Sequence, residues 1–181
     1  MSTHYLDGWR IDVERREGVP RLVPATVLAR TVAAALSAAG APRPASIALL
    51  LSDDAELAGL NGAHMGKEGP TDVLSFPLLA PSDFPDHAGK GSSDELLAAP
   101  ADGFALPPGA RPQLGDIVVS VERAVAQAGA GRGGQTGDVR WDARDELRLL
   151  VAHGTLHICG WDHAEPAEEA AMRDLERRLL A

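Results

Sequence analysis

Apolar and charged residues alternate over residues 9–17, with the period of a strand that has one face in water. A continuous apolar run over residues 46–52 is typical of a strand buried on both faces. Two further runs, at 73–78 and 115–121, are rich in β-branched and apolar residues. The pattern therefore predicts four strands.

Helical patterns alternate with these strands. Residues 24–39 begin with a proline, are rich in alanine and leucine, and end before Gly40. Asp142 is placed to cap a helix that runs to residue 159. Shorter helical segments are expected at 53–61 and 122–128, and a last helix at 166–180. This order predicts an α+β (α/β-like) fold, with about five helices around a mixed four-stranded sheet.

The length of 181 residues fits a single domain, residues 1–181. A stretch at 81–112, between two of the expected strands, is rich in proline, glycine, serine and acidic residues. Loops of this length are unusual inside a compact domain, so we interpret the stretch as a flexible insertion. It is not interpreted as a linker, because the strands on either side must pair in one sheet.

Composition and charge narrow the function classes. With 45% hydrophobic and 24% charged residues the chain has the composition of a globular protein, and it contains no apolar run long enough to cross a membrane. The single cysteine, Cys159, and the lack of a secretory signal pattern predict the cytoplasm. The net charge of −9 means that an RNA partner must meet a local basic face or be delivered by a larger assembly.

Three histidines lie close together in the segment HGTLHICGWDH. His153 and His157 are four residues apart on the expected helix, so their rings project from one face. Gly160 can reverse the chain after the helix and return His163 to the same point. The spacing equals that of the HExxHxxGxxH zinc peptidases, but Gly154 replaces the glutamate that serves as their general base.

Three imidazoles and one open coordination position are typical of a catalytic zinc site, and we expect one Zn²⁺ per chain. Zinc lowers the pKa of bound water to about 7, so hydrolysis is compatible with the missing glutamate, although peptide hydrolysis is disfavoured. Asp162 is either an outer carboxylate that holds a ligand ring or a solvated acid in a turn. Cys159 is expected to be a small buried residue, not a fourth ligand.

The segment PTDVLSFP carries a proline at each end, which suits an edge strand. Such an edge could hold an extended substrate or simply end the sheet.

The segments GPTDVLSFP, LGDIVVS and HGTLHICGWDH, in this order, resemble the YbeY family of metal-dependent endoribonucleases, also called ribosomal RNA maturation factors. The resemblance implies one domain with a mixed four-stranded sheet and a zinc ion held by His153, His157 and His163. It also implies cleavage of single-stranded RNA, a part in maturing the 3′ end of small-subunit (16S) ribosomal RNA and in ribosome quality control, and the small ribosomal subunit as a partner. The motif positions that line or support the cleft in the family are Asp72, Ser75 and Asp116.

The chain departs from the family pattern at two places. Met65 stands where many relatives have an arginine that is thought to help with RNA, and the phosphate contact could instead come from Arg132, Arg140 or Arg144. The insertion at 81–112 is also longer than is usual in the family. Its acidic half would repel phosphate if it folded over the cleft.

Two alternatives remain open from the sequence. The first is a zinc peptidase or another small hydrolase, which the ligand spacing favours and Gly154 opposes. The second is a non-catalytic ribosome assembly factor in which zinc only staples the C-terminal helices. No membrane partner is expected, and the sequence assigns neither a general acid nor an oligomeric state.

Overall fold

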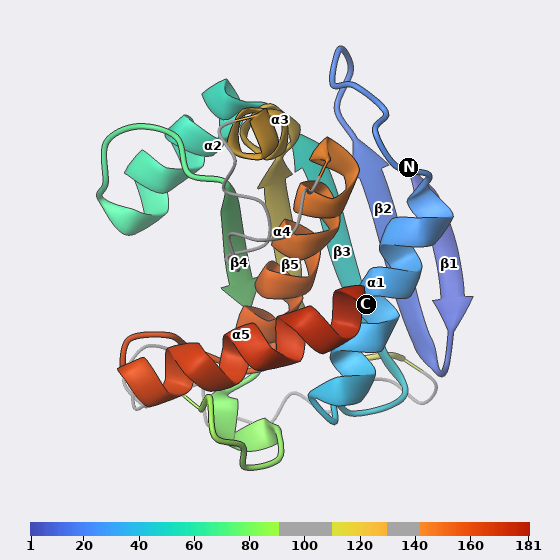
Figure 1. Cartoon of the computed structure of the whole chain (residues 1–181). Helices are drawn as coiled ribbons and strands as arrows, with labels where there is room; N and C mark the ends of the chain where they lie inside the picture. Colours follow the sequence, from blue (N-terminus) through green and yellow to red (C-terminus); the bar gives the residue numbers. More distant parts are fainter. Residues whose placement is uncertain (91–109, 130–141) are drawn as a thin grey trace.

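The computed structural model describes residues 1–90, 110–129 and 142–181 (Figure 1). Five strands form one mixed sheet in the order β1-β2-β3-β5-β4. The central strands β2, β3 and β5 run parallel, and β1 and β4 are antiparallel strands at the two edges. The strands are β1 (Ser2–Leu6), β2 (Trp9–Arg15), β3 (Ala45–Ser52), β4 (Val73–Pro77) and β5 (Gln113–Ser120).

The expected four strands are present, and the prediction of a four-stranded sheet was wrong by one strand. The additional strand, β1, forms a hairpin with β2 through Asp7 and Gly8, both of which have positive φ values, 49° and 93°. Asp-Gly is a preferred pair for such a two-residue hairpin turn. The β1 sequence contains few apolar residues because it lies at the sheet edge with every second side chain exposed.

All five expected helices are present. They are α1 (Ala25–Ala38), α2 (Asp54–Leu60), α3 (Val121–Gly129), α4 (Ala143–Ile158) and α5 (Pro166–Leu180). Asp142 caps α4 as expected, because its carboxylate accepts hydrogen bonds from the backbone N–H groups of Arg144 and Asp145. A π-helical turn, η1 (Asn61–Met65), extends α2, and a 3-10 turn, η2 (Pro81–Asp83), follows β4.

Helices α1 and α4 lie side by side over one face of the sheet, and α5 crosses the lower end of α4 and ends beside α1 (Figure 1). The main core fills the space between these helices and the sheet. Strand β2 shows how: its buried residues alternate with more polar ones, so that one face of the strand carries Trp9, Ile11 and Val13 into this core. On the opposite face, the ring of His64 in η1 meets the ring of Phe76 in β4, with centroids 5.2 Å apart. The segment of α2 and η1 therefore covers the far side of the β4 edge.

The predicted insertion at 81–112 falls partly outside the described residues, which stop at residue 90 and resume at residue 110. The described beginning of the insertion packs under the C-terminal end of α4. Lys90 forms an antiparallel bridge with Trp161, and the Gly89 carbonyl accepts a hydrogen bond of 2.7 Å from the Asp162 N–H. None of the described helices is long and apolar enough to cross a membrane.

Candidate metal centre and groove

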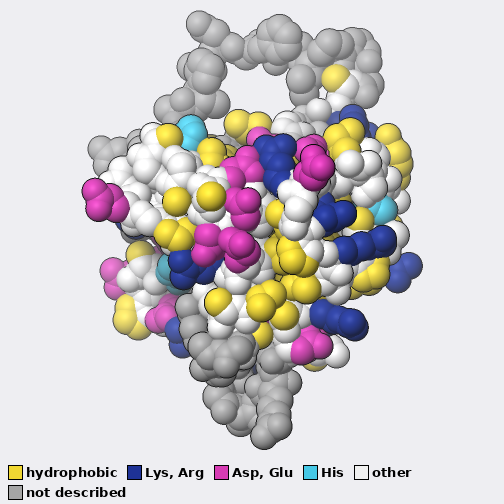
Figure 2. All heavy atoms as spheres, turned by 90° about the horizontal axis from the view of Figure 1, so that it is seen from above, with side chains coloured by type: hydrophobic (Ala, Val, Ile, Leu, Met, Phe, Trp, Pro, Cys, Tyr) yellow, Lys and Arg dark blue, Asp and Glu magenta, His cyan; other side chains and the backbone are white. Residues whose placement is uncertain are grey.

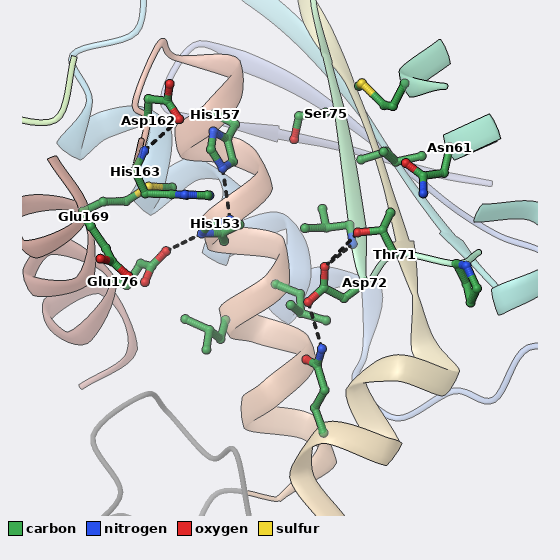
Figure 3. A pocket seen from close by; sticks show the side chains of 18 of the residues that line it. Asn61, Thr71, Asp72, Ser75, His153, His157, Asp162, His163, Glu169 and Glu176 are labelled. Atoms are coloured by element: carbon green, nitrogen blue, oxygen red, sulfur yellow. Dashed lines mark hydrogen bonds and ion pairs between the residues drawn. The ribbon is translucent and has the colours of Figure 1, made fainter. Parts of the chain in front are cut away.

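The last two turns of α4 and the bend after it bring the three histidines together. His153 and His157 project from one face of α4, and Gly160, with φ 81°, turns the chain so that His163 returns to them. The three ring centroids are 4.5 to 5.4 Å apart. One ligand atom from each ring lies within 4.8 Å of the others, and Figure 3 shows the rings facing a common point. The predicted cluster is therefore formed.

The hydrogen bonds of two rings fix which nitrogen carries the proton. His153 Nδ1 donates to the Glu176 carboxylate at 2.7 Å, and His157 Nδ1 donates to the Trp161 carbonyl at 2.8 Å. When both rings are neutral, both Nε2 atoms present lone pairs, and they face each other at 3.0 Å. A proton or a cation between two such nitrogens relieves their repulsion, and zinc ligands in a tetrahedral site are about 3.3 Å apart, close to the distance seen here. The residues present therefore fit a divalent metal ion.

The pKa of His157 also favours the neutral form of its ring. Burial, and then the neighbouring rings of His153 and His163, lower the pKa of His157 to about 4. The ring is neutral at pH 7, which is the form that binds metals.

Gly154 lets α4 approach the sheet closely. A Cβ atom at this position would lie 2.8 Å from methyl groups of Ile117 and Val73, closer than side chains pack. The Ser75 hydroxyl also donates a hydrogen bond of 2.9 Å to the Gly154 carbonyl. A glutamate cannot occupy this position without moving the helix away from the sheet. The close packing of α4 is therefore incompatible with a glutamate general base at residue 154.

A groove of about 930 Å³ runs along the outer edge of β4 and contains the histidines. One wall is formed by α4 and α5, and the other by residues 61–70 (Figure 3). Met65 lines this second wall and is 47% exposed.

Asp72 lies in the groove and remains ionised. Burial raises the pKa of its carboxyl group, but hydrogen bonds from the Gln127 side chain and from backbone N–H groups, together with His153, outweigh burial, so the pKa is lowered. The Gln127 amide donates to the carboxylate at 2.8 Å. Asp72 is thus an acceptor that ties β4 to α3, and it is not placed to give up a proton near neutral pH.

The other expected site residues lie in three different settings. Ser75 lines the groove, with its hydroxyl engaged by Gly154. Asp116 is exposed on the opposite face of the sheet, because its neighbour Ile117 faces α4, and the groove does not include it. Asp162 lines the groove, and its carboxylate accepts a hydrogen bond from the backbone N–H of His163 at 2.8 Å rather than from a ring in this structure.

The arginines considered for RNA contact do not enter the groove as far as the structure describes them. Arg144 is exposed in the first turn of α4 and does not line the groove. Arg132 and Arg140 lie outside the described residues. On the face seen in Figure 2, acidic and basic side chains occur together, so this face is not one continuous basic surface.

Two groups that hold the ligand rings were not found from the sequence. Glu176 is 3% exposed and holds His153, and the Trp161 carbonyl holds His157. A signal for Glu176 exists, because it follows Met172 by four residues on the buried face of α5. The expectation for Cys159 is met: it is buried, and burial raises the pKa of its thiol to about 12.

Comparison with known proteins gives the family. The family described as Endoribonuclease YbeY matches residues 14–181. The chain belongs to this family. An endoribonuclease YbeY from Roseiflexus castenholzii is 36% identical over 171 residues, covering 94% of this chain and 90% of the relative. One from Salinispora tropica is 42% identical over 148 residues, covering 81% of this chain and 80% of the relative.

A solved structure shares the YbeY-like fold. The solution structure of TM1509 from Thermotoga maritima matches with a TM-score of 0.50 and 18% identity, covering 94% of this chain and 86% of that one. At this identity the likeness concerns the fold alone.

Proposed function

We propose that this protein is a zinc-dependent endoribonuclease specific for single-stranded RNA. In this proposal it acts in maturation of the 3′ end of small-subunit (16S) ribosomal RNA and in ribosome quality control, in the cytoplasm. Membership of the YbeY family supports cleavage of RNA phosphodiester bonds. The observation that carries the proposal is the convergence of three imidazole nitrogens in a groove that is open to an extended substrate.

His153, His157 and His163 would hold the metal ion. Bound zinc supplies a Lewis acid for the scissile phosphate and an activated water near neutral pH. Glu176 and the Trp161 carbonyl keep the Nδ1 protons of two rings in place, so that Nε2 remains available. Asp72 holds the β4 wall against α3, and Ser75 holds the same wall against α4. In this proposal Glu176 and the Trp161 carbonyl orient the ligand rings, and Asp72 and Ser75 hold a wall of the groove.

The close packing at Gly154 argues against the peptidase alternative. In zinc peptidases of this spacing a glutamate follows the first histidine and activates water. Here a Cβ atom at that position would lie 2.8 Å from methyl groups of Ile117 and Val73, closer than van der Waals contact, so the packing leaves no room for a carboxylate side chain. A phosphodiester needs charge neutralisation and a positioned nucleophile, which the metal site can provide without this glutamate.

The test compares metal content and cleavage in one preparation. Protein purified without added metal should contain about one zinc per chain by elemental analysis, and it should cleave a single-stranded 16S 3′-end precursor RNA. A chelator should stop this cleavage, and casein should remain intact. His157→Ala should lose zinc and cleavage together while it keeps its circular dichroism spectrum. Cleavage by a folded, metal-free variant would refute the proposal, and normal 16S maturation in cells that carry this variant would favour a non-catalytic role.

A further inference from the structure

Lys67 lines the groove on the wall that faces the metal centre. The histidines belong to the wall of α4 and α5, whereas Lys67 belongs to the wall of residues 61–70. Figure 3 shows Asn61, at the start of this second wall, across the groove from the histidines. Lys67 is exposed, so its ammonium group can meet a ligand that lies in the groove.

The positive charge of Lys67 is not used by the described part of the chain. Besides the histidines, the described lining of the groove contains two basic side chains, Lys67 and Arg173. Arg173 forms an ion pair with Glu169 on its own helix. No acidic side chain among the described residues forms an ion pair with Lys67. Lys67 is therefore the described cation of the second wall that remains available to an anion.

Most acidic residues of the groove are engaged within its walls. Four of the six that line it are either nearly buried or held by a basic or amide side chain. These four are Asp72, Glu146, Glu169 and Glu176, and the other two are Glu68 and Asp162. Positive charge would therefore face the open groove at two places, at a metal ion held by the histidines and at Lys67.

Asn61 holds the segment that carries Lys67. Its side-chain amide donates a hydrogen bond of 2.9 Å to the Gly69 carbonyl, and its own carbonyl accepts one of 3.4 Å from the Lys67 N–H. Asn61 is itself only 7% exposed. Gly66 and Gly69 have positive φ values, 62° and 87°, which let the chain turn at each end of this short segment. The backbone of Lys67 is thus held in place, and less freedom is lost when its side chain binds a ligand.

A phosphate of single-stranded RNA is the ligand that this arrangement fits. Every nucleotide of such a strand carries one negative phosphate. A strand whose scissile phosphate lies at the metal centre therefore brings neighbouring phosphates into the groove as well. The lysine ammonium group is a compact charge with three donors and no planar geometry to satisfy, so it suits the phosphate of a flexible strand.

We propose that Lys67 binds a phosphate that flanks the scissile phosphate of the RNA substrate, and that Asn61 is the positioning residue that keeps Lys67 at the groove. The proposal rests on the proposed function, because it takes RNA as the substrate of the metal centre. It adds a contact on the wall opposite the metal centre, so that an RNA strand would be held from both sides of the groove.

Binding is measured by fluorescence anisotropy with the full chain, a chelator that keeps the RNA intact, and a fluorescein-labelled single-stranded RNA from the 16S 3′ end. Lys67→Gln should weaken binding about fivefold, because it removes one phosphate contact. It should also reduce the slope of log K against log salt concentration by about 0.7, the contribution of one phosphate on a single strand. Lys67→Arg should restore both quantities, since it keeps the charge.

The chain offers a matched control, because it contains one other lysine. Lys90 does not line the groove, and its side chain forms an ion pair of 2.6 Å with Asp86. Lys90→Gln removes the same charge and should change neither the affinity nor the salt slope. An equal change in Lys90→Gln and Lys67→Gln would mean that net charge matters and not a site at Lys67, and it would overturn the proposal.

Cleavage by the zinc-loaded protein supplies a second readout. Lys67→Gln should raise KM about fivefold with kcat and zinc content unchanged, because a contact to a flanking phosphate is the same before and during the chemical step. Asn61→Ala, checked for folding by thermal melting, should raise KM about threefold. In the Asn61→Ala background, Lys67→Gln should cost less than it does in the unaltered protein, because the lysine is no longer held in place. An equal cost in both backgrounds would reject the role of Asn61.

The outcomes separate this proposal from the proposed function. If the unaltered protein cleaves RNA and Lys67→Gln keeps the full salt slope, the phosphate contact is wrong and the function stands. If the zinc-loaded protein binds the RNA without cleaving it, and the slope still falls in Lys67→Gln, the function is wrong and the contact stands. A folded protein that binds no RNA would contradict both. The Lys67 variants change an exposed side chain, so they test the contact even if Asn61→Ala does not fold.

Discussion

The carboxylate of Glu176 on α5 accepts a hydrogen bond of 2.7 Å from Nδ1 of His153 on α4. The contact is almost fully buried on the glutamate side. It fixes the ring so that Nε2 faces the other histidines, and it links the C-terminal helix directly to the metal centre. Helix α5 is therefore part of the site, although it supplies no ligand.

Replacing Glu176 with Gln should weaken metal binding about 10- to 100-fold, because outer carboxylates of this kind orient the ligand and raise its basicity. Affinity is measured by titrating zinc against a competing chromophoric chelator. Glu169→Gln is the control, since this glutamate pairs with Arg173 on the same helix and touches no ligand ring by a described hydrogen bond. Unchanged affinity in Glu176→Gln would show that the contact does not hold the ligand.

Substitution of Gly154 by Ala should destabilise the protein by about 1 to 3 kcal/mol, because the added methyl group overlaps Ile117 and Val73. Gly59→Ala is a matched control in another helix, since no atom lies within 4 Å of its Cβ position. This control should be neutral or stabilise by up to about 1 kcal/mol. Urea denaturation measures both variants, and equal effects would contradict the tight approach of α4 to the sheet.

A third prediction concerns Gly89, which packs against Trp161 in the turn between α4 and His163. A Cβ atom at Gly89 would overlap the Trp161 ring, and the Trp161 carbonyl holds His157. Gly89→Ala should therefore displace residue 161 and weaken zinc binding about tenfold, while most of the fold is retained. Gly62→Ala, in the η1 turn with its nearest neighbour at 3.9 Å, is the control for a glycine on the other wall. If Gly89→Ala binds zinc as tightly as the unaltered protein does, the packing of residue 89 against Trp161 does not support the metal centre.

Much of the fold follows from periodicity in the sequence. The buried strands and the capped helices were predicted close to their observed limits, because their apolar patterns and caps are local signals. Strand β1 was missed since an edge strand with one wet face contains few apolar residues. The Asp7-Gly8 pair could have revealed it, because Asp-Gly is a preferred sequence for a two-residue hairpin turn.

The metal ligands could be predicted because their spacing along one helix and the turn after it determines where the three rings lie relative to one another. The groups that orient them could not be predicted with the same ease. Glu176 meets His153 only through the crossing of α4 and α5, and the Trp161 contact is made by a backbone carbonyl, which leaves no mark on residue type. Asp116 was assigned from its motif, but the alternation along β5 turns it to the other face. Contacts between distant elements are set by packing rather than by local pattern.

The pH dependence of stability should carry a contribution from Glu56 at acidic pH. Hydrogen bonds from Arg16 and Ser52, together with the charge of Arg16, lower the pKa of Glu56 to about 2 against an unfolded value of 4.5. A depressed folded pKa stabilises the protein above the unfolded pKa, and this stabilisation is lost as the pH falls from about 4.5 to about 2. Because Glu56 is partly exposed, we expect about 1 kcal/mol rather than the full linkage value. Urea denaturation of the protein and of Glu56→Gln at several pH values between 2 and 7 measures it. The stability difference between the two should shrink as the pH is lowered, and a difference that stays constant would mean that the Arg16–Glu56 contact does not stabilise the fold.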